Sequence, residues 1–163
     1  MTCCYIGLGS NLANALGTPA EHLASAIKAF ESSPHFDHVQ VSSLYQSKAF
    51  GVTDQPDFLN AVLKADTDLS ALALLDFCQN LEKIAKRERL RHWGERSLDV
   101  DVLLYGENSI HHPRLTVPHA GLFERNFVLI PMLEIEPTLV INGQALAALS
   151  EAKNWQGLTL LKN

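Results

Sequence analysis

The chain has 163 residues, of which 47% are hydrophobic and 19% are charged. This length and composition predict a single globular domain spanning residues 1–163, and they exclude a disordered or fibrous protein. Thirteen Lys and Arg residues against eighteen Asp and Glu residues give a formal net charge of −5, which disfavours a nucleic-acid partner.

The first half of the chain predicts one helix and three strands. Thr18, Pro19 and Glu21 have the spacing of a capping box with proline at the first helical position. A helix should therefore begin here, and it should end before Pro34. Apolar runs and period-two alternation predict strands at residues 3–8, 39–47 and 58–64.

The second half predicts a helix that follows Ser70 and reaches Ile84, because apolar residues recur at spacings of three and four. A fourth long strand at residues 98–105 completes the order β-α-β-β-α-β. This order predicts an α+β, ferredoxin-like core with a largely antiparallel sheet covered by helices. Extra C-terminal elements should follow: short strands, a short helix near residues 121–126, a helical stretch at residues 144–151 and an irregular tail.

The spacing of the cysteines and the absence of long apolar runs predict a cytoplasmic protein. Cys3, Cys4 and Cys78 lack metal-ligand spacing, which predicts reduced, buried thiols in a cytoplasmic protein. The chain has neither a basic leader followed by an apolar stretch nor a run of about 18 apolar residues. We therefore expect neither secretion nor insertion into a membrane.

Asp99 and Asp101 are the strongest candidates for chemistry. Two positions apart in a strand, their side chains share one face, with Cα atoms about 6.6 Å apart, while Val100 points the other way. Two close carboxylates repel each other unless a positive charge lies between them. Mg²⁺ binds through one or two carboxylates together with substrate phosphates, so the pair predicts a magnesium site. The alternative is a solvated face of an edge strand.

A cationic segment lies just before this pair. Residues 83–96 hold six of the thirteen cationic residues and two of the eighteen acidic ones, a net charge of +4, whereas the rest of the chain carries −9. Such a focused charge favours a compact anion such as a polyphosphate over a long nucleic-acid backbone. Lys86 and Arg87 also fit a simple helix end, where cations are favoured, but Arg96 does not.

Other candidates are weaker. The run Gly7-Leu8-Gly9-Ser10-Asn11 lacks the lysine of a phosphate-binding P-loop and equally predicts a tight turn after a strand. Phe58 and Asn60 share a strand face and could bind a flat heterocycle, although Phe58 alone would more often be a core residue. His119 fits either a loop position or a phosphate contact, and the pair His111-His112 predicts a surface loop.

Motifs along the chain resemble those of the 6-hydroxymethyl-7,8-dihydropterin pyrophosphokinase family of folate synthesis. The most specific is HWGERSLDVDVL at residues 92–103. The others follow in the family's order and spacing: YIGLGSNL (5–12), SSLY (42–45), DQPDFLNA (54–61), RLTVPH (114–119) and RNFVLIPM (125–132). The resemblance covers about residues 4–140.

The resemblance implies a catalytic and an ATP-binding set. Asp99 and Asp101 would hold two Mg²⁺ ions that bridge the ATP phosphates, and Arg87 and Arg96 would contact those phosphates. The remaining ATP-binding residues would be Gln79, Glu82, Val102, Arg114, Thr116, His119 and Arg125.

The resemblance also implies a pterin-binding set and mobile loops. The pterin would lie between the rings of Phe58 and Phe127. Asn60 and the backbone from Ser47 to Phe50 would bond its edge. Loops would close over the substrates, with Arg89 and Trp93 in the mobile part.

Some positions depart from the family pattern. Lys48-Ala49 replaces a frequent pair of prolines, and Phe58 and Ala120 each replace a frequent tyrosine. The stretch at residues 82–93 is one residue shorter than in the best-known members, so Lys86 could take the role implied for Arg87.

The implied reaction transfers the terminal two phosphates of ATP as one unit to the hydroxymethyl oxygen of the pterin and releases AMP. We expect a monomer that acts on these two small molecules in the cytoplasm, without nucleic acid or membrane. A metal-dependent nucleotide phosphohydrolase is the alternative that the carboxylates and cations also allow. An RNA-binding module of the RRM type shares the element order, but the acidic charge and the lack of an aromatic run on the strands disfavour it.

Overall fold

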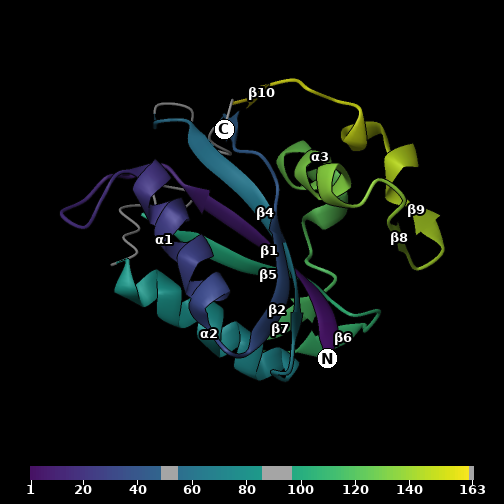
Figure 1. Ribbon diagram of the computed structural model, residues 1–163. Helices are drawn as coiled ribbons and strands as arrows, with labels where there is room; N and C mark the ends of the chain where they lie inside the picture. Colours follow the sequence, from purple (N-terminus) through teal and green to yellow (C-terminus); the bar gives the residue numbers. More distant parts are fainter. Residues whose placement is uncertain (49–54, 86–96, 162–163) are drawn as a thin grey trace.

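The computed structural model describes residues 1–48, 55–85 and 97–161 (Figure 1). One antiparallel sheet is built from β1 (Thr2–Ser10), β2 (Phe36–Val41), β3 (Tyr45–Ser47), β4 (Phe58–Thr67), β5 (Asp99–Tyr105) and β10 (Leu158–Leu160). The strand order is β10-β3-β4-β1-β5, and β2 pairs with β4 further along the same edge as β3. The helices are α1 (Pro19–Ser32), α2 (Ala71–Ile84) and α3 (Asn126–Ile135).

This topology confirms the predicted ferredoxin-like fold. If β2 and β3 are counted as one interrupted strand, the chain follows the order β-α-β-β-α-β through β5. The first and third strands of that series, β1 and β4, are neighbours at the centre of the sheet. Strand β5 pairs with β1 on one side, and β2 and β3 pair with β4 on the other.

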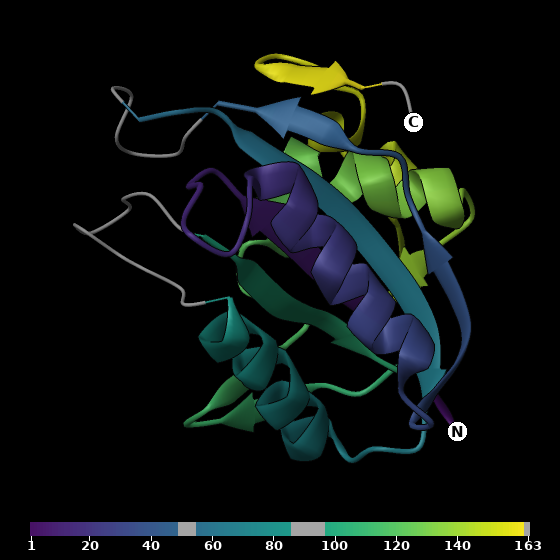
Figure 2. The same cartoon turned by 60° about the vertical axis from the view of Figure 1, so that its left-hand side comes forward.

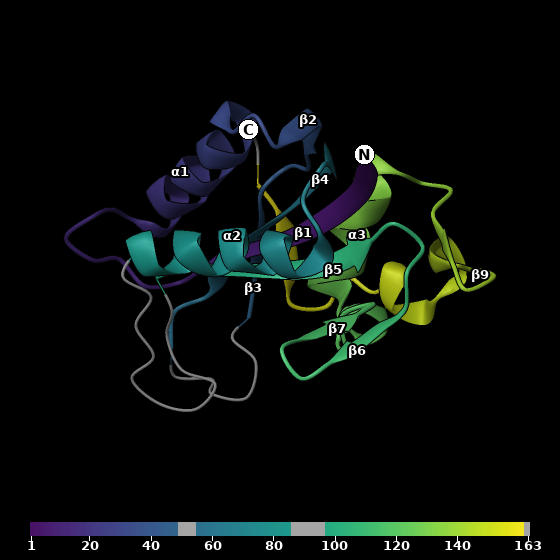
Figure 3. The same cartoon turned by 90° about the horizontal axis from the view of Figure 1, so that it is seen from below.

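The two faces of the sheet are covered differently. Helices α1 and α2 lie on one face, whereas α3 and the C-terminal elements lie on the other (Figures 1, 2 and 3). Under α1 and α2, the sheet residues Ile6, Leu63 and Val100 pack against Phe30 and Leu74 in the larger apolar core. A second core packs α3 against the opposite face and includes Tyr5, Val62, Leu103, Leu129 and Met132.

Local chemistry explains where two helices begin. The Glu21 N–H donates to the Thr18 hydroxyl at 3.2 Å, and the Thr18 N–H donates to the Glu21 carboxylate at 3.0 Å. This is the predicted capping box, and Pro19 occupies the first turn. The Ser70 hydroxyl caps α2 by accepting the Ala73 N–H at 3.2 Å.

The expected single strand at residues 39–47 is wrong, because the structure has β2 and β3 in its place. Ser42 lies between the two strands and pairs with Val62 of β4 through its main-chain N–H and its side-chain hydroxyl. Its N–H donates to the Val62 carbonyl, and its hydroxyl accepts the Val62 N–H, each at 2.9 Å. The chain therefore stays against β4 while the strand is interrupted.

The expectations for the last third of the chain need larger corrections. Near residues 121–126 there is only a 3₁₀ turn, η1 (Leu122–Glu124), and the unpredicted helix α3 follows. Helix α3 is apolar on almost every side, so its sequence has no amphipathic period. It also contains Pro131, a residue that usually ends a helix. The stretch at residues 144–151 forms no α-helix, because Leu149 is extended and separates two 3₁₀ turns. The tail is not irregular throughout, since β10 joins the sheet.

The remaining short elements are not part of the six-stranded sheet. They are β6 (Ile110–His112), β7 (Leu115–Val117), β8 (Val140–Ile141), β9 (Gln144–Ala145), η2 (Leu146–Ala148) and η3 (Ser150–Ala152). The pair His111-His112 is exposed, as expected, but it lies in the β6–β7 hairpin and not in a loop. Within the described ranges, every helix is too short or too polar to cross a bilayer.

All three cysteines are free thiols, as predicted. Cys4 and Cys78 are buried, and burial raises the pKa of Cys4 to about 12. Cys3 is only partly buried, so the expectation of full burial is wrong for this residue.

Candidate active site

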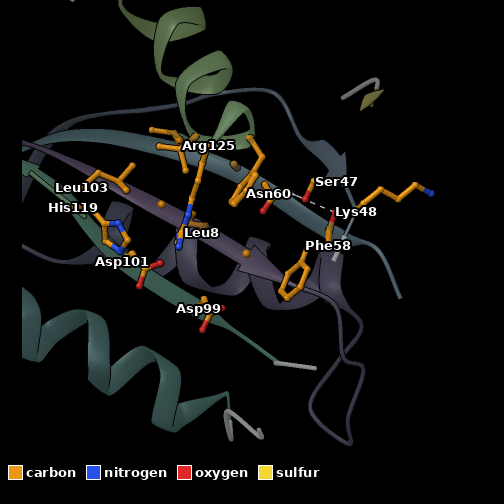
Figure 4. Close-up of a pocket in the computed structure, with 16 residues that line it drawn as sticks. Leu8, Ser47, Lys48, Phe58, Asn60, Asp99, Asp101, Leu103, His119 and Arg125 are labelled. Atoms are coloured by element: carbon orange, nitrogen blue, oxygen red, sulfur yellow. Dashed lines mark hydrogen bonds between the residues drawn. The ribbon is translucent and has the colours of Figure 1, made fainter. Parts of the chain in front are cut away.

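A cavity lies on the α3 side of the sheet, over the second half of β1 (Figure 4). It brings together strands β1, β3, β4 and β5 with the segment that leads into α3. The residues that line it are Gly7, Leu8, Gly9, Ser47, Lys48, Phe58, Asn60, Ala61, Val62, Asp99, Asp101, Leu103, His119, Arg125, Phe127 and Val128.

Two glycines form part of the cavity floor. In the β1–β5 ladder Gly7 is paired with Asp101 and Gly9 with Asp99, so these residues project toward the same face. A Cβ on Gly7 would lie 3.4 Å from the Leu103 side chain, in close contact. Without side chains at both positions, the sheet is bare main chain beside the carboxylates, which leaves room for a ligand.

Asp99 and Asp101 lie on one face of β5, as predicted, and both line the cavity (Figure 4). Val100 and Val102 point to the opposite face, where each is 3% exposed in the larger core. The alternative of a solvated edge is correct in one respect, because β5 ends the sheet among the described strands. The carboxylates themselves are half-buried at the cavity wall.

The carboxylate pair fits a cation that is shared with a ligand. Among the described residues, no three or more His, Cys, Asp and Glu side chains gather as a group that could hold a metal. Asp99 and Asp101 nevertheless supply hard oxygen donors that border an open cavity. Mg²⁺ is held in this way, through few carboxylates and substrate phosphates, so the residues present fit Mg²⁺ bound together with a polyphosphate.

His119 lies next to Asp101 at the cavity wall (Figure 4). The Gly121 N–H donates to Nδ1 of His119 at 3.1 Å, so a neutral ring carries its proton on Nε2. Burial lowers the pKa of His119, Asp101 opposes this change, and Arg125 adds to it. The neutral ring therefore offers an N–H donor beside the carboxylates.

Arg125 extends into the cavity toward His119 and Asp101 (Figure 4). Its guanidinium occupies the space that a side chain at position 121 would fill. A Cβ on Gly121 would lie 2.5 Å from Cζ of Arg125 and 2.9 Å from its Nη2. The guanidinium also lies over the Phe127 ring, with Cζ 5.8 Å from the ring centroid.

Aromatic and amide groups line the part of the cavity that β3 and β4 form. Nδ2 of Asn60 donates to Oγ of Ser47 at 2.7 Å, and both side chains are buried (Figure 4). Phe58 lines the cavity beside them, which confirms that Phe58 and Asn60 share a face. Phe127 enters the same cavity from α3. These groups could hold a flat, polar-edged ring by stacking and hydrogen bonding.

The run from Gly7 to Asn11 is not a turn, because β1 continues to Ser10. Beyond the glycines, the Ser10 hydroxyl donates to the Ser97 carbonyl at 2.5 Å. Nδ2 of Asn11 donates to Oε1 of Gln55 at 2.8 Å and to the Pro56 carbonyl at 2.9 Å. These two residues tether the segments next to β4 and β5, a role that sequence reasoning missed.

Five residues expected at the ATP site do not line this cavity: Gln79, Glu82, Val102, Arg114 and Thr116. Nη2 of Arg114 lies 3.2 Å from Oε1 of Gln79 and 2.5 Å from Oδ1 of Asp76, on the exposed side of α2. Thr116 is exposed on β7. The Val102 side chain is buried in the opposite core, so only its main chain could contact a ligand.

Six residues of the sequence predictions lie outside the described ranges. They are Phe50, Lys86, Arg87, Arg89, Trp93 and Arg96. Their expected roles in catalysis, ATP binding, pterin binding and loop motion therefore stay predictions. Leu103 and Val128 line the cavity without having been expected there, because only their neighbours in the fold bring them to it.

The fold and the cavity define an α+β protein with a small-molecule site on the α3 face of a ferredoxin-like sheet. Residues 5–137 match the family model described as 7,8-dihydro-6-hydroxymethylpterin-pyrophosphokinase (HPPK). The chain belongs to this family.

Two similar proteins carry the name of this family's enzyme. The 2-amino-4-hydroxy-6-hydroxymethyldihydropteridine pyrophosphokinase of Haemophilus influenzae is 47% identical over 150 residues, which cover 91% of each chain. The enzyme of the same name from Pseudomonas aeruginosa is 42% identical over 158 residues, covering 96% of this chain and 95% of the relative.

Solved structures support the fold. The HPPK-DHPS of Plasmodium falciparum, crystallised with pteroate, superposes with a TM-score of 0.69 at 12% identity and 93% coverage of this chain. A crystal structure of HPPK-DHPS in complex with substrates superposes with a TM-score of 0.68 at 10% identity. The chain spans less than half of either of these longer proteins, 44% in both cases.

Proposed function

We propose that this protein transfers pyrophosphate from ATP to the hydroxymethyl group of 6-hydroxymethyl-7,8-dihydropterin and releases AMP. One observation carries the proposal. The family match spans residues 5–137, and motif residues far apart in that span, among them Phe58, Asp101, His119 and Phe127, line one cavity. ATP is the co-substrate that this activity requires.

The aromatic part of the cavity suits the pterin. Its flat bicyclic ring would stack on Phe58 and Phe127, because aromatic faces attract each other in offset arrangements. The buried Asn60–Ser47 pair, joined at 2.7 Å, offers an amide and a hydroxyl to the polar edge of the ring. Orientation would thus come from hydrogen bonds, and affinity from the rings.

The carboxylate part of the cavity suits the triphosphate. Asp99 and Asp101 would hold two Mg²⁺ ions, which when bound would neutralise phosphate charge and hold the phosphates in line. Arg125 brings a guanidinium to this part of the cavity, and His119 brings an imidazole. Arg87 and Arg96 would add further phosphate contacts, as the family resemblance implies.

The transfer itself forms one bond and breaks one. The hydroxymethyl oxygen bonds to the β-phosphorus of ATP, the bond from that phosphorus to the oxygen shared with the α-phosphate breaks, and AMP leaves with that oxygen. The hydroxyl proton is lost, and among the described cavity residues a carboxylate of the Asp99–Asp101 pair could accept it. Positioning and charge neutralisation supply most of the acceleration in such reactions.

One assay separates this function from nucleotide hydrolysis. The full chain is incubated with ATP and Mg²⁺, with and without 6-hydroxymethyl-7,8-dihydropterin, and AMP and phosphate are quantified. We expect AMP to form only when the pterin is present, in amounts equal to the pterin diphosphate. Release of phosphate from ATP at the same rate without pterin would instead identify a phosphohydrolase.

The wider setting is proposed on the same basis. Residues 1–163 would form one pterin pyrophosphokinase domain, active as a monomer in the cytoplasm without nucleic-acid or membrane partners. The net charge of −5 supports the absence of a nucleic-acid partner. Light scattering of the active protein, with and without ATP, tests the monomer.

A further inference from the structure

The C-terminal segment, residues 154–160, lies beyond the part of the chain that the family model matches. It runs along the sheet edge next to the aromatic part of the cavity. Strand β10 pairs antiparallel with β3, with Leu158 opposite Ser47 and Leu160 opposite Tyr45. Ser47 is the residue that accepts the Asn60 amide in the cavity, so the segment borders one wall of the site directly.

The same segment is bonded to the opposite wall. Asn126, the first residue of α3, uses its side-chain amide for two hydrogen bonds. Nδ2 donates to the Asn154 carbonyl at 2.8 Å and to the Gln156 carbonyl at 3.1 Å. Asn126 lies between the cavity residues Arg125 and Phe127, so these bonds fix the helix end from which both side chains enter the cavity.

A second attachment holds the β3 side. The Lys48 N–H donates to the Gly157 carbonyl at 3.2 Å. Gly157 has φ +73, and a Cβ there would lie 3.3 Å from Cγ of Lys48. Glycine adopts this backbone with less strain than other residues, and it leaves room for the close approach to Lys48.

Apolar packing joins the two attachments. Leu158 is 7% exposed and packs in a small cluster with Tyr45 of β3 and Ile130 of α3, against which Phe127 also packs. Trp155 adds a ring contact to Tyr45, with centroids 6.1 Å apart. The segment is therefore linked to both walls by polar and by apolar contacts.

We propose that residues 154–160 act as a clamp that sets the spacing between the Phe127 wall and the Ser47 wall, and that Asn126 is its positioning residue. This inference rests on the proposed function, because the spacing matters for a stacked pterin. The clamp contacts neither Asp99 nor Asp101 in any described hydrogen bond. It should therefore govern pterin binding and leave the carboxylate part of the site unaffected.

Three variants test the clamp. Asn126→Ala removes both amide hydrogen bonds, and Gly157→Ala disturbs the second attachment. Gly143→Ala is the matched control, because Gly143 also has a positive φ of +78 but nothing lies within 4 Å of its Cβ position. Two measurements are made on the full-length protein: the KM values for pterin and ATP, and hydrogen exchange of the peptide covering residues 45–48.

We expect Asn126→Ala and Gly157→Ala to raise the pterin KM about tenfold, with the ATP KM changed by less than about twofold. The first variant loses two hydrogen bonds, and the second introduces strain at the attachment to Lys48. Both should speed exchange at residues 45–48, although Asn126 lies on the other wall. Gly143→Ala should match the wild type in both measurements.

Other outcomes overturn the clamp. Unchanged exchange at residues 45–48 in Asn126→Ala would show that the walls are not coupled. Faster exchange with an unchanged pterin KM would remove its role in binding, and equal effects of Gly143→Ala would reduce it to general backbone strain. If the wild type makes no AMP with pterin, the proposed function fails, and exchange alone then decides whether the clamp exists.

Discussion

The carboxylate of Glu82, on the last turn of α2, accepts the main-chain N–H of Val100 at 2.9 Å. Val100 is the residue between Asp99 and Asp101, so a single hydrogen bond ties the helix to the point of β5 where the carboxylate pair projects. The family resemblance implies an ATP contact for Glu82. The described contact makes Glu82 a support for the strand that carries the pair, and the ATP contact stays a prediction.

Substituting Glu82 should separate these two roles. Glu82→Gln keeps an oxygen acceptor for the Val100 N–H, and we expect its activity to stay close to that of the wild type. Glu82→Ala loses the acceptor and should destabilise the fold by about 1–3 kcal/mol. It should also raise the Mg²⁺ concentration needed for half-maximal AMP formation. Equal loss of activity in both variants would point to a direct contact with ATP.

Removing either carboxylate should abolish turnover. We expect Asp99→Ala and Asp101→Ala to lower the rate of AMP formation by roughly 10²–10³-fold or more, because uncompensated phosphate charge would remain in the transition state. Their unfolding temperatures should not fall, because each substitution removes one of two close like charges and because Asp disfavours strands. Near-normal activity in either variant, measured at saturating Mg²⁺, contradicts the metal role.

Chelation gives an independent check on the same pair. EDTA in excess should stop AMP formation, and added Mg²⁺ should restore it. The unfolding temperature in EDTA should equal that in buffer, because the described cores on both faces of the sheet are held by apolar packing and not by a metal. A lower unfolding temperature in EDTA would indicate a structural metal instead.

Gly121→Ala should act through Arg125. Position 121 has φ −93 and ψ 1, which alanine adopts readily, so the backbone is unaffected. The new Cβ would displace the guanidinium, and we expect kcat/KM for ATP to fall about tenfold. In an Arg125→Ala background the same change should have almost no effect. Additive losses in this double-mutant cycle would mean that Gly121 acts by another route.

The two aromatic residues should differ in what they tolerate. Phe127→Ala removes a stacking ring and should weaken pterin binding by about tenfold or more, since base–aromatic stacking is worth about 1–3 kcal/mol. Phe58→Tyr keeps the ring and should bind pterin as the wild type does. Titration calorimetry with the pterin and a non-hydrolysable ATP analogue measures both, and an unchanged pterin affinity in Phe127→Ala contradicts stacking.

Features that depend on neighbouring residues were predictable from the sequence. The capping box at Thr18 and Glu21 needs only a three-residue spacing, and the structure contains both of its hydrogen bonds. The common face of Asp99 and Asp101 follows from the period of a strand, whichever strand lies beside it. The ferredoxin-like order followed in the same way from the succession of local patterns.

Features that depend on distant partners were not predictable. Helix α3 has no polar face, because the sheet covers one side and C-terminal elements contact another. Its pattern therefore lacks the helical period. Strand β10 is three residues long and gains its structure from pairing with β3, more than a hundred residues earlier. The contact between the Arg125 guanidinium and Gly121 could not be predicted either, because it depends on the conformation of the arginine side chain.

The tethers at the end of β1 bear on how this family can vary in length. Nδ2 of Asn14 donates to the Ala85 carbonyl at 2.9 Å, and the Ser10 hydroxyl donates to the Ser97 carbonyl. The two ends of the span from 85 to 97 are thus hydrogen-bonded to Asn14 and Ser10, which are four positions apart in the chain. Gain or loss of one residue within that span costs little loop-closure entropy. It need not shift Asp99, so insertions and deletions can accumulate there without changing the register of the carboxylates.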